Sequence, residues 1–570
     1  MKMKTVAKRF LVLSQALLLA FGGAACSGKV VDGGEGIDET KTQLYVSAYD
    51  AGYGQMWLDM YKEKFEALYA DHSFEDDKMG VQVMIDWNQG TGQNLIAQMN
   101  GADTQVYFNV VDYYDLVSSG NALNLTEILN EDLGEFGESG KNVMGKIPTD
   151  IKSYFESVNG GVYAVPSTET WNGIQYNIDL FEEEGFYFAS EYDEATPEFT
   201  TGLADDLPKA KGPDNLPNTF DDGLPATINQ FYQLLDYMLE CNVIPFTFTE
   251  SLGYAEMLPW MLFVNFQGKK ELDINFSFRG TAESLIDVDK SGNVTPLPPT
   301  EINDSNAYML MKQKGFYQAL QVVEKLINKK GESYFSPDAF SGDQNHIAAQ
   351  EEYLYSEIFA ASDSTKRPIA FLVEGTYWQA EAVGIFEDIE GKYGKGDQYS
   401  INKRRFGVMP LPHFDESRVG QKNTILAGTL NCFARGGQKG AQLEVTKKFI
   451  QFINTDPMIL NYVKEAGYLR GVNVEFTKDD IKDLTPYAQN LLTVKQNSDV
   501  LHPVSTNPIW VANATGATQW QTRKNGWLFV MNGSNMSPVT NFYNNGVLTA
   551  SDYFNGMYTN MKGRWSTLKK

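Results

Sequence analysis

The residues best suited to bind a small molecule lie in the segment 158–185, VNGGVYAVPSTETWNGIQYNIDLFEEEG. A β-prone run stops at Pro166, and a polar loop then carries Trp171 and Asn172. Proline ends a strand because its ring fixes φ and removes the backbone donor. One large aromatic face among hydroxyl, amide and carboxyl groups suits a hydroxylated ring ligand. An ordinary loop with a partly buried tryptophan would have the same sequence, so this segment alone leaves both interpretations open.

Further polar and aromatic residues follow the predicted strands 44–50, 81–87 and 106–110. A predicted helix follows each strand, and this alternation with continuous apolar strands indicates a doubly wound parallel sheet. Ligands of such sheets bind beyond the carboxyl ends of the strands. The residues at those ends are Tyr49, Asp50, Trp87, Asn88 and Asp112.

Motifs for catalysis are absent from the sequence. The four histidines are isolated, and the sequence has no HExxH, GxSxG, GxxxxGKS/T or GxGxxG motif in a suitable context. The 73 acidic residues would include a glycosidase-like carboxylate pair by chance alone. The sequence therefore favours a binding protein that is not an enzyme, and a secreted glycan-active enzyme stays open as an alternative.

The N-terminus predicts export. Residues 1–25 combine Lys and Arg with a short apolar run and small residues, which is typical of a signal peptide and too short for a membrane span. Cys26 follows two alanines, as in a bacterial lipoprotein lipobox, although Gly23 stands where leucine is usual. Cleavage at a conventional signal-peptidase site is the alternative. We expect lipidation at Cys26, a flexible tether over 26–41, and attachment to the outer face of a bacterial cytoplasmic membrane.

Length and charge narrow the function classes further. A chain of 570 residues predicts two or more domains, and a net charge of −26 argues against nucleic-acid binding, which needs basic residues. Cys241 and Cys432 are too few for a disulfide scaffold and are expected to be buried thiols.

An acidic loop suggests one cofactor hypothesis. Within the polar segment 187–226, Asp214, Asp221 and Asp222 lie close together among turn residues. Such oxygen ligands suit a structural calcium ion, but the spacing does not follow the EF-hand pattern, and a solvated acidic loop explains the same residues. No other cofactor is expected.

Several segments, in order over about 44–475, together resemble the extracellular solute-binding proteins of bacterial ABC importers. The match is to the carbohydrate-binding family that includes maltose-binding protein. The matching segments are GVYAVPSTETWNGIQYNIDLFEEEG, INQFYQLLDYMLECNVIPFTF, IAFLVEGTYW, FGVMPLP, AGTLNCFARGGQKGAQLEVTKKFIQFINTDP and EAGYLRGV. In the last of these, Arg470 stands where the family usually has proline.

The resemblance implies a two-lobed α/β periplasmic-binding-protein fold of type II, each lobe a doubly wound, mostly parallel sheet with flanking helices. Lobe 1 is then expected over 42–155 and 427–475, and lobe 2 over 158–424 and 480–570 with the insert 187–226. The resemblance also implies a carbohydrate ligand, closure of the lobes on it, and delivery by a monomer to the permease subunits of an importer. A peptide- or polyamine-binding protein of the same fold is the alternative.

Within this resemblance, Trp171 and Trp378 are the predicted stacking platforms for a sugar, with Trp87 as a third. The predicted hydroxyl partners are Asn88, Asp112 and Glu374. Weaker candidates by position are Asn172, Tyr49, Gly428 and Tyr468; Trp510 and Trp527 follow only from composition. Core or interlobe packing would explain each of these side chains equally well.

Overall fold

A computed structural model describes residues 36–49, 52–88, 90–190, 196–249, 254, 256–394, 398–512, 530–531, 534–535, 538–545 and 548–568. The predicted signal peptide, Cys26 and Trp527 lie outside the described residues. Within those residues, no helix has the length and apolar character needed to cross a membrane.

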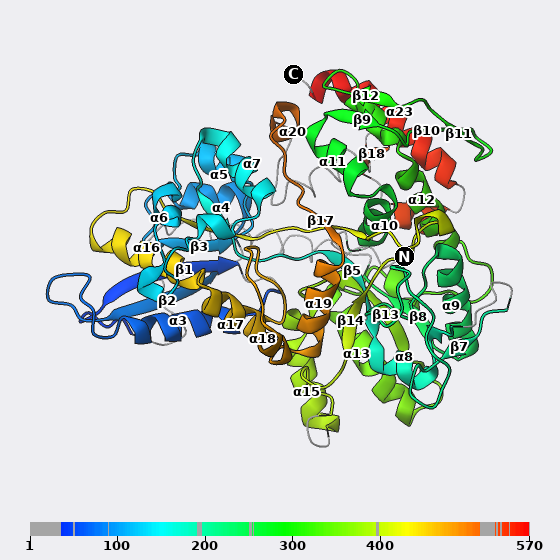
Figure 1. Cartoon of the computed structure of the whole chain (residues 1–570), viewed down its shortest axis with the longest axis horizontal. Helices are drawn as coiled ribbons and strands as arrows, with labels where there is room; N and C mark the ends of the chain where they lie inside the picture. Colours follow the sequence, from blue (N-terminus) through cyan, green and yellow to red (C-terminus); the bar gives the residue numbers. More distant parts are fainter. Residues whose placement is uncertain are drawn as a thin grey trace, which may run out of the picture.

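Lobe 1 is built on a five-stranded sheet, at the left of Figure 1. The strand order is β2 (Val81–Asn88), β1 (Thr42–Tyr49), β3 (Val106–Asn109), β16 (Asn431–Ala434) and β4 (Ala164–Pro166). The first three strands are parallel, and β16 is antiparallel to both β3 and β4. The lobe also contains α3 (Met56–Leu68), α4 (Gly92–Gln98), α5 (Tyr113–Ser118), α6 (Thr126–Asn130), α7 (Thr149–Asn159), α16 (Ala441–Ile453) and α17 (Asp456–Ala466).

Lobe 2 is built on a four-stranded sheet in the order β14 (Phe406–Met409), β5 (Asn172–Asn177), β13 (Ile369–Gly375) and β8 (Ile244–Thr247). Only the pair β13–β8 is parallel, because β5 runs antiparallel to both of its neighbours. Its helices are α8 (Ile178–Glu184), α9 (Ile228–Glu240), α13 (His346–Ser362), α14 (Trp378–Glu381), α15 (Val383–Tyr393), α18 (Lys478–Lys482) and α19 (Pro486–Gln496).

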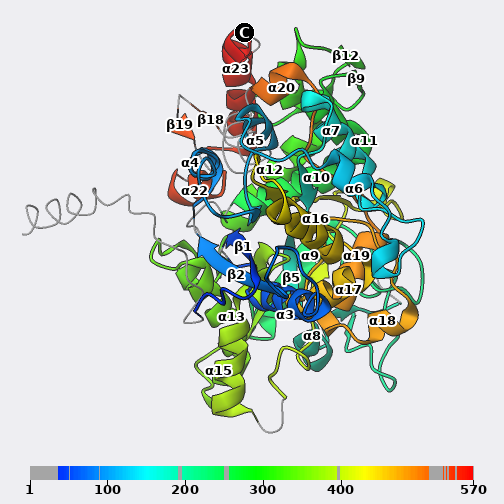
Figure 2. The same cartoon turned by 90° about the vertical axis from the view of Figure 1, so that its left-hand side faces the viewer.

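A further layer extends lobe 2 at the upper right of Figure 1, and Figure 2 shows it above the two sheets. It contains α10 (Met257–Gln267), α11 (Lys269–Ser277), α12 (Lys314–Ile327), α20 (Pro508–Ala512), α22 (Pro538–Asn545) and α23 (Ala550–Leu568). Short strand pairs complete it: β9 (Gly280–Ala282) with β12 (Thr300–Ile302), β10 (Ile286–Val288) with β11 (Val294–Pro296), and β18 (Val530–Met531) with β19 (Ser534–Asn535). Helix α10 is buried along almost its whole length, since its sequence, MLPWMLFVNFQ, is apolar on every side.

The sequence signals for helix starts are met in the structure. Asn177 caps α8 by accepting a hydrogen bond from the Leu180 backbone, and Thr227 opens α9 with a capping box that includes Gln230. These caps fix where α8 begins after β5 and where α9 begins before β8.

The two-lobed α/β fold is as predicted, but two details differ. Strand β4 belongs to the sheet of lobe 1, so lobe 1 continues to Pro166 rather than ending at 155. The sheets are mixed rather than mostly parallel, because β5 and β16 each follow a crossing between the lobes and enter their sheets in the reverse direction.

The insert 187–226 forms a hairpin-like pair, β6 (Tyr187–Phe188) with β7 (Phe199–Thr200), and then the acidic loop. In that loop the Thr219 hydroxyl lies 2.8–3.3 Å from oxygens of Asp214, Asp221 and Asp222. Burial and the charge of Asp214 raise the pKa of Asp221 to about 6. The described residues contain no His/Cys/Asp/Glu group with metal-binding geometry, so calcium binding here stays a prediction without structural support.

Candidate functional site

A cavity of about 250 Å³ lies where the chain crosses between the lobes. Tyr53 and Val110, which follow strands β1 and β3, line it from lobe 1. Residues 170–173 contribute from the first crossing, and 423–429 from the second, which contains β15 (Thr424–Leu426). The remaining walls belong to lobe 2: Tyr254, Met257, Trp260, Met261, Val264, Tyr377, Val408, Met409, Pro410, Leu411, Val494 and Ser498.

No charged side chain is present among the described residues that line this cavity. Its polar groups are amides and hydroxyls, from Asn172, Asn423 and neighbouring threonines, and its apolar groups include five aromatic rings. Most ligand pockets are mainly apolar with a few placed polar groups, and this lining fits that description. The arrangement suits an uncharged ligand that has both apolar faces and hydrogen-bonding groups.

The first crossing holds Trp171 in place through its backbone. The Thr170 N–H donates to the Gly428 carbonyl at 3.0 Å, and the Gly428 N–H returns a bond to Thr170 at 2.8 Å. Trp171 receives the Thr376 N–H on its carbonyl at 2.9 Å and donates its own N–H to the Thr376 hydroxyl at 3.2 Å. The backbone around Trp171 is therefore bonded to both the second crossing and the residue after β13.

The indole N–H of Trp171 is buried, and it has no acceptor among the described residues. Buried donors are nearly always paired in proteins, by protein or by water, because desolvation of an unpaired donor is costly. This donor belongs to a ring that lines the cavity, so a ligand oxygen or a water molecule would satisfy it.

Three tyrosines from both lobes meet at one side of the cavity. The rings of Tyr53 and Tyr377 lie 5.1 Å apart, and the hydroxyls of Tyr254 and Tyr377 are separated by 3.5 Å. Burial raises the pKa of all three hydroxyls, so they stay protonated at neutral pH and can donate hydrogen bonds. Tyr53 comes from lobe 1 and the other two from lobe 2, so this contact joins the two lobes at one side of the cavity.

Of the ligand-contact residues predicted from the sequence, Trp171, Asn172 and Gly428 line the cavity. Trp378 does not: it has 0% exposure and is packed among Tyr353, Phe406 and Tyr487. The structure thus argues against Trp378 as a stacking platform, because its ring has no free face, and places the adjacent Tyr377 at the cavity instead.

Two predicted carboxylates have structural partners. Asp112 is buried and caps helix α5 by accepting a bond from the Asp115 N–H at 3.1 Å. Glu374 is buried and accepts bonds from the Gly375 N–H at 2.6 Å and the Gln350 amide at 3.2 Å. Burial, with a smaller effect of Glu381, raises the pKa of Glu374 well above its usual value. Neither residue lines the cavity, so the structure does not support a role as ligand hydroxyl partner for either.

None of the remaining predicted residues is among the described residues that line the cavity. Trp87 is half-buried and meets Trp57 edge-on at 6.4 Å, and Tyr49 pairs in register with Asn88 at the ends of their strands. The side chain of Asn88 lies outside the described part of the chain. Tyr468 is buried and acts indirectly, since its hydroxyl donates to the Tyr53 carbonyl at 2.8 Å and so supports the cavity loop. Trp510 lies in the core of lobe 2.

The cavity also includes residues that the sequence interpretation missed: Tyr53, Tyr254, Trp260, Tyr377 and Asn423. A sequence signal existed only for Tyr377, which stands beside Trp378 in the segment IAFLVEGTYW. Which of two adjacent aromatic residues faces a cavity depends on how helix α14 begins, and the sequence alone does not specify this.

Comparisons with known structures agree with this geometry. A chitin oligosaccharide binding protein matches over 90% of this chain and 95% of its own, with 14% identity and a TM-score of 0.50. The SBP RafE in complex with raffinose matches over 92% and 100%, with 14% identity and a TM-score of 0.51. A cyclic alpha-maltosyl-1,6-maltose binding protein from Arthrobacter globiformis matches over 92% and 100%, with 11% identity and a TM-score of 0.50.

At this level of identity the likeness shows the fold: the chain has the two-lobed architecture of type II periplasmic binding proteins. The three proteins named above are each described as binding proteins for a carbohydrate or in complex with one. Comparison of the sequence with protein-family models and with curated proteins finds no match.

Proposed function

We propose that this protein is the extracellular solute-binding component of a bacterial ABC importer and captures a neutral carbohydrate between its lobes. The observation that carries the proposal is the cavity at the crossings, which is lined by aromatic rings, amides and hydroxyls without a charged side chain among its described residues. A sugar has apolar C–H faces and a rim of hydroxyls, so stacking and uncharged hydrogen bonds are the matching interactions.

The same lining argues against the alternatives. A polyamine would need carboxylates around it, and a free peptide would need partners for its charged ends. Hydrolysis of a glycan would need a pair of carboxyl groups facing the ligand. The described cavity residues offer none of these groups, and the similar structures named above are described as binding oligosaccharides or raffinose.

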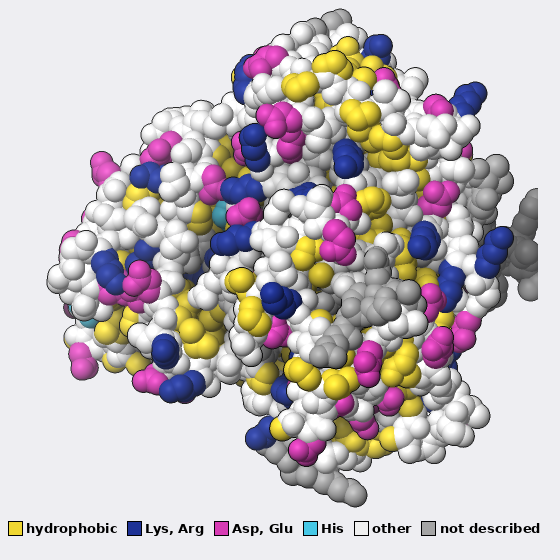
Figure 3. Space-filling model, turned by 45° about the vertical axis from the view of Figure 1, so that its right-hand side comes forward, with side chains coloured by type: hydrophobic (Ala, Val, Ile, Leu, Met, Phe, Trp, Pro, Cys, Tyr) yellow, Lys and Arg dark blue, Asp and Glu magenta, His cyan; other side chains and the backbone are white. Residues whose placement is uncertain are grey.

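The N-terminal sequence is the basis for proposing that the protein is anchored at the cell surface. We infer lipidation of Cys26 and a flexible tether that lets the lobes reach permease subunits in the cytoplasmic membrane. The face in Figure 3 has acidic and basic side chains interspersed, without a continuous basic patch, which agrees with tethering by lipid rather than by charge. Incorporation of radiolabelled palmitate into the wild type and not into Cys26→Ser would support the anchor, and no incorporation would refute it.

Isothermal titration calorimetry with maltose, raffinose and chitin oligosaccharides, against spermidine and a tripeptide, tests the ligand class. We expect at least one neutral sugar to bind and neither spermidine nor the tripeptide to bind. Binding of spermidine or the tripeptide, with no sugar bound, would refute the proposal. Scattering should show a smaller radius of gyration with the bound sugar, because the lobes close on it.

A further inference from the structure

The segment 499–507, here called the strap, runs along the hinge after helix α19 of lobe 2. Its first part is β17 (Asp499–Leu501), which pairs in parallel with β15 on the second crossing. The Leu501 carbonyl accepts the Ala427 N–H at 2.9 Å, and the Leu501 side chain packs in the core of lobe 2. The strap therefore starts from lobe 2 and reaches the hinge at the level of the cavity.

The strap then contacts lobe 1 through an ion cluster. The two ring nitrogens of His502 lie 2.8 Å from an Asp150 oxygen and 3.1 Å from a Glu169 oxygen. Asp150 belongs to helix α7 of lobe 1, and Glu169 lies on the first crossing, bonded through its backbone to Leu469 of lobe 1. The second oxygen of Glu169 pairs with Lys495 of helix α19, so the cluster joins both lobes.

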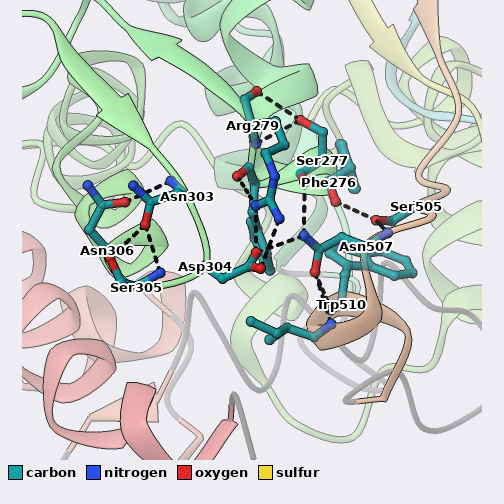
Figure 4. A network of polar contacts seen from close by, with 12 residues as sticks. Phe276, Ser277, Arg279, Asn303, Asp304, Ser305, Asn306, Ser505, Asn507 and Trp510 are labelled. Atoms are coloured by element: carbon teal, nitrogen blue, oxygen red, sulfur yellow. Dashed lines mark hydrogen bonds and ion pairs between the residues drawn. The ribbon is translucent and has the colours of Figure 1, made fainter.

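Beyond this cluster the strap returns to lobe 2 and is fixed there (Figure 4). Ser505 donates to the Phe276 carbonyl, and the Asn507 amide donates to the Ser277 carbonyl at 3.1 Å and to Asp304 at 3.0 Å. Asp304 is itself paired with Arg279 through two bonds. The part of the strap that touches lobe 1 is thus held on both sides by lobe 2.

We propose that the strap is a conformational restraint, in which charged His502 holds Asp150 of lobe 1 and Glu169 of the crossing against lobe 2 and so limits lobe opening. A ring that faces a carboxylate at each nitrogen can donate to both only as the imidazolium. Loss of one proton would turn one of these bonds into a contact between a lone pair and a carboxylate. The restraint then weakens while the backbone path of the strap is unchanged.

The surrounding charges support the imidazolium. Three other charged groups lie near the cluster: Lys495, Lys269 and Asp273. Lys495 pairs with Glu169, and the Lys269 ammonium donates to the Val500 carbonyl. Burial raises the pKa of Asp273, and Asp273 lies close enough to Asp150 for the charge of Asp150 to raise that pKa further. Burial alone would lower the pKa of His502, but the hydrogen bonds and charges of Asp150 and Glu169 raise that pKa to about 9. A raised histidine pKa means that the stabilisation is complete below the unfolded pKa near 6.5 and is lost as pH rises through about 9.

Pulsed EPR distances in the ligand-free full-length chain test this proposal independently of the sugar, so a failure here leaves the proposed ligand untouched. Spin labels at Lys64→Cys in lobe 1 and Glu240→Cys in lobe 2, with Cys26 and Cys241 replaced by serine, report the separation of the lobes. We expect a longer and broader distance distribution at pH 10 than at pH 7. His502→Gln should show the longer distribution at both pH values, and Asp150→Asn should lengthen it at pH 7.

His72→Gln, at an exposed histidine of lobe 1 outside the cluster, is the matched control and should keep the wild-type pH response. Circular dichroism would verify that each variant is folded, and Asp150→Asn provides a second route if His502→Gln is not. Identical wild-type distributions at pH 7 and pH 10, or a folded His502→Gln or Asp150→Asn variant with the wild-type distribution, would overturn the proposal.

Discussion

Trp171 and Trp378 carry the same side chain and are almost equally buried, at 4% and 0% exposure, yet their surroundings differ. Trp378 is enclosed by aromatic rings of the core, with Tyr353, Phe406 and Tyr487 at centroid distances of 5.3–6.0 Å. Trp171 sits on the first crossing between the lobes and borders the cavity. Low exposure therefore does not separate a packing tryptophan from a binding one; the presence of unfilled space beside the ring does.

The two regions also differ in whether a ligand can reach their polar groups. Next to Trp378, at the end of β13, the polar groups of Glu374 and Gln350 bond to each other and to the backbone. The indole N–H groups of both tryptophans have no acceptor among the described residues, but only that of Trp171 belongs to a ring that borders the cavity. A ligand can reach an unpaired donor that borders the cavity, but it cannot reach one that is enclosed by core rings.

The largest expected effect comes from Trp378→Ala. Removing a fully enclosed aromatic ring leaves a cavity that its neighbours refill only in part, which typically costs about 3–5 kcal/mol of unfolding free energy. Urea denaturation of the variant should show that loss. Where the variant remains folded, calorimetry should find sugar affinity close to that of the wild type, and a selective loss of affinity would place Trp378 at the ligand after all.

Trp171→Ala should weaken binding and also lower stability, because the ring borders the cavity and packs in the core at 4% exposure. Loss of the contact with one face of a buried aromatic ring is expected to weaken sugar affinity by about 1.5–3 kcal/mol, or roughly 10- to 150-fold. Trp171→Phe keeps a ring and removes the N–H, so it should lose a smaller part of the affinity and separates stacking from hydrogen bonding. Both are measured by calorimetry with the sugar identified for the wild type.

The matched control for Trp171 is Trp87→Ala, at a half-buried tryptophan that packs on Trp57 and does not line the cavity. We expect its affinity to stay within about twofold of the wild type, since its ring packs on Trp57 and has no contact with the cavity lining among the described residues. Unchanged affinity in Trp171→Ala, or an equal loss in Trp87→Ala, would show that the cavity is not the binding site.

Glu374→Gln tests how the buried carboxyl group of Glu374 makes stability depend on pH. The raised pKa of Glu374 means that its carboxyl stays protonated in the folded protein and ionises on unfolding. Stability from this group is therefore complete below its usual pKa of 4.5 and is lost as pH rises above it. Glutamine does not ionise, so the stability of the variant relative to the wild type should be higher at pH 8 than at pH 4. Thermal unfolding at both pH values measures this, with exposed Glu127→Gln as the control. A difference from the wild type that is the same at pH 4 and pH 8 would contradict the prediction.

The lobes and their order could be predicted from the sequence because their signals are local. Apolar runs such as VQVMIDW and caps such as Thr227 specify elements within one segment, and the observed β2 and α9 follow them closely. The direction of β5 and the membership of β4 depend on pairing with strands hundreds of residues away. The sequences of β4 and β5 contain no signal for those partners, β16 and β13, so the sequence predicts a boundary of lobe 1 at 155, before β4.

The site was predictable only where the chain itself must pass the cavity. Trp171, Asn172 and Gly428 lie on the crossings, and any two-lobed fold of this type brings crossings to the cleft. Trp378 and Tyr377 differ by one position on the turn into α14, and a rotation of about 100° per helical residue decides which ring faces inward. Tyr53 and Trp260 reach the cavity through tertiary packing that has no signature in their own segments.

The smallest expected effect is that of Asn172→Ala, which tests whether the cavity's uncharged polar groups contribute to binding. Asn172 is half-buried at the start of β5 and lines the cavity beside Trp171. One hydrogen bond to a neutral partner contributes about 0.5–1.5 kcal/mol, so calorimetry should show affinity reduced roughly 2- to 12-fold with stability nearly unchanged. Asn130→Ala on α6, an exposed asparagine far from the cavity, should leave affinity unchanged. If Asn172→Ala binds as the wild type does while Trp171→Ala does not, recognition at this cavity depends on the aromatic ring alone, and the ligand need not present a hydroxyl at that position.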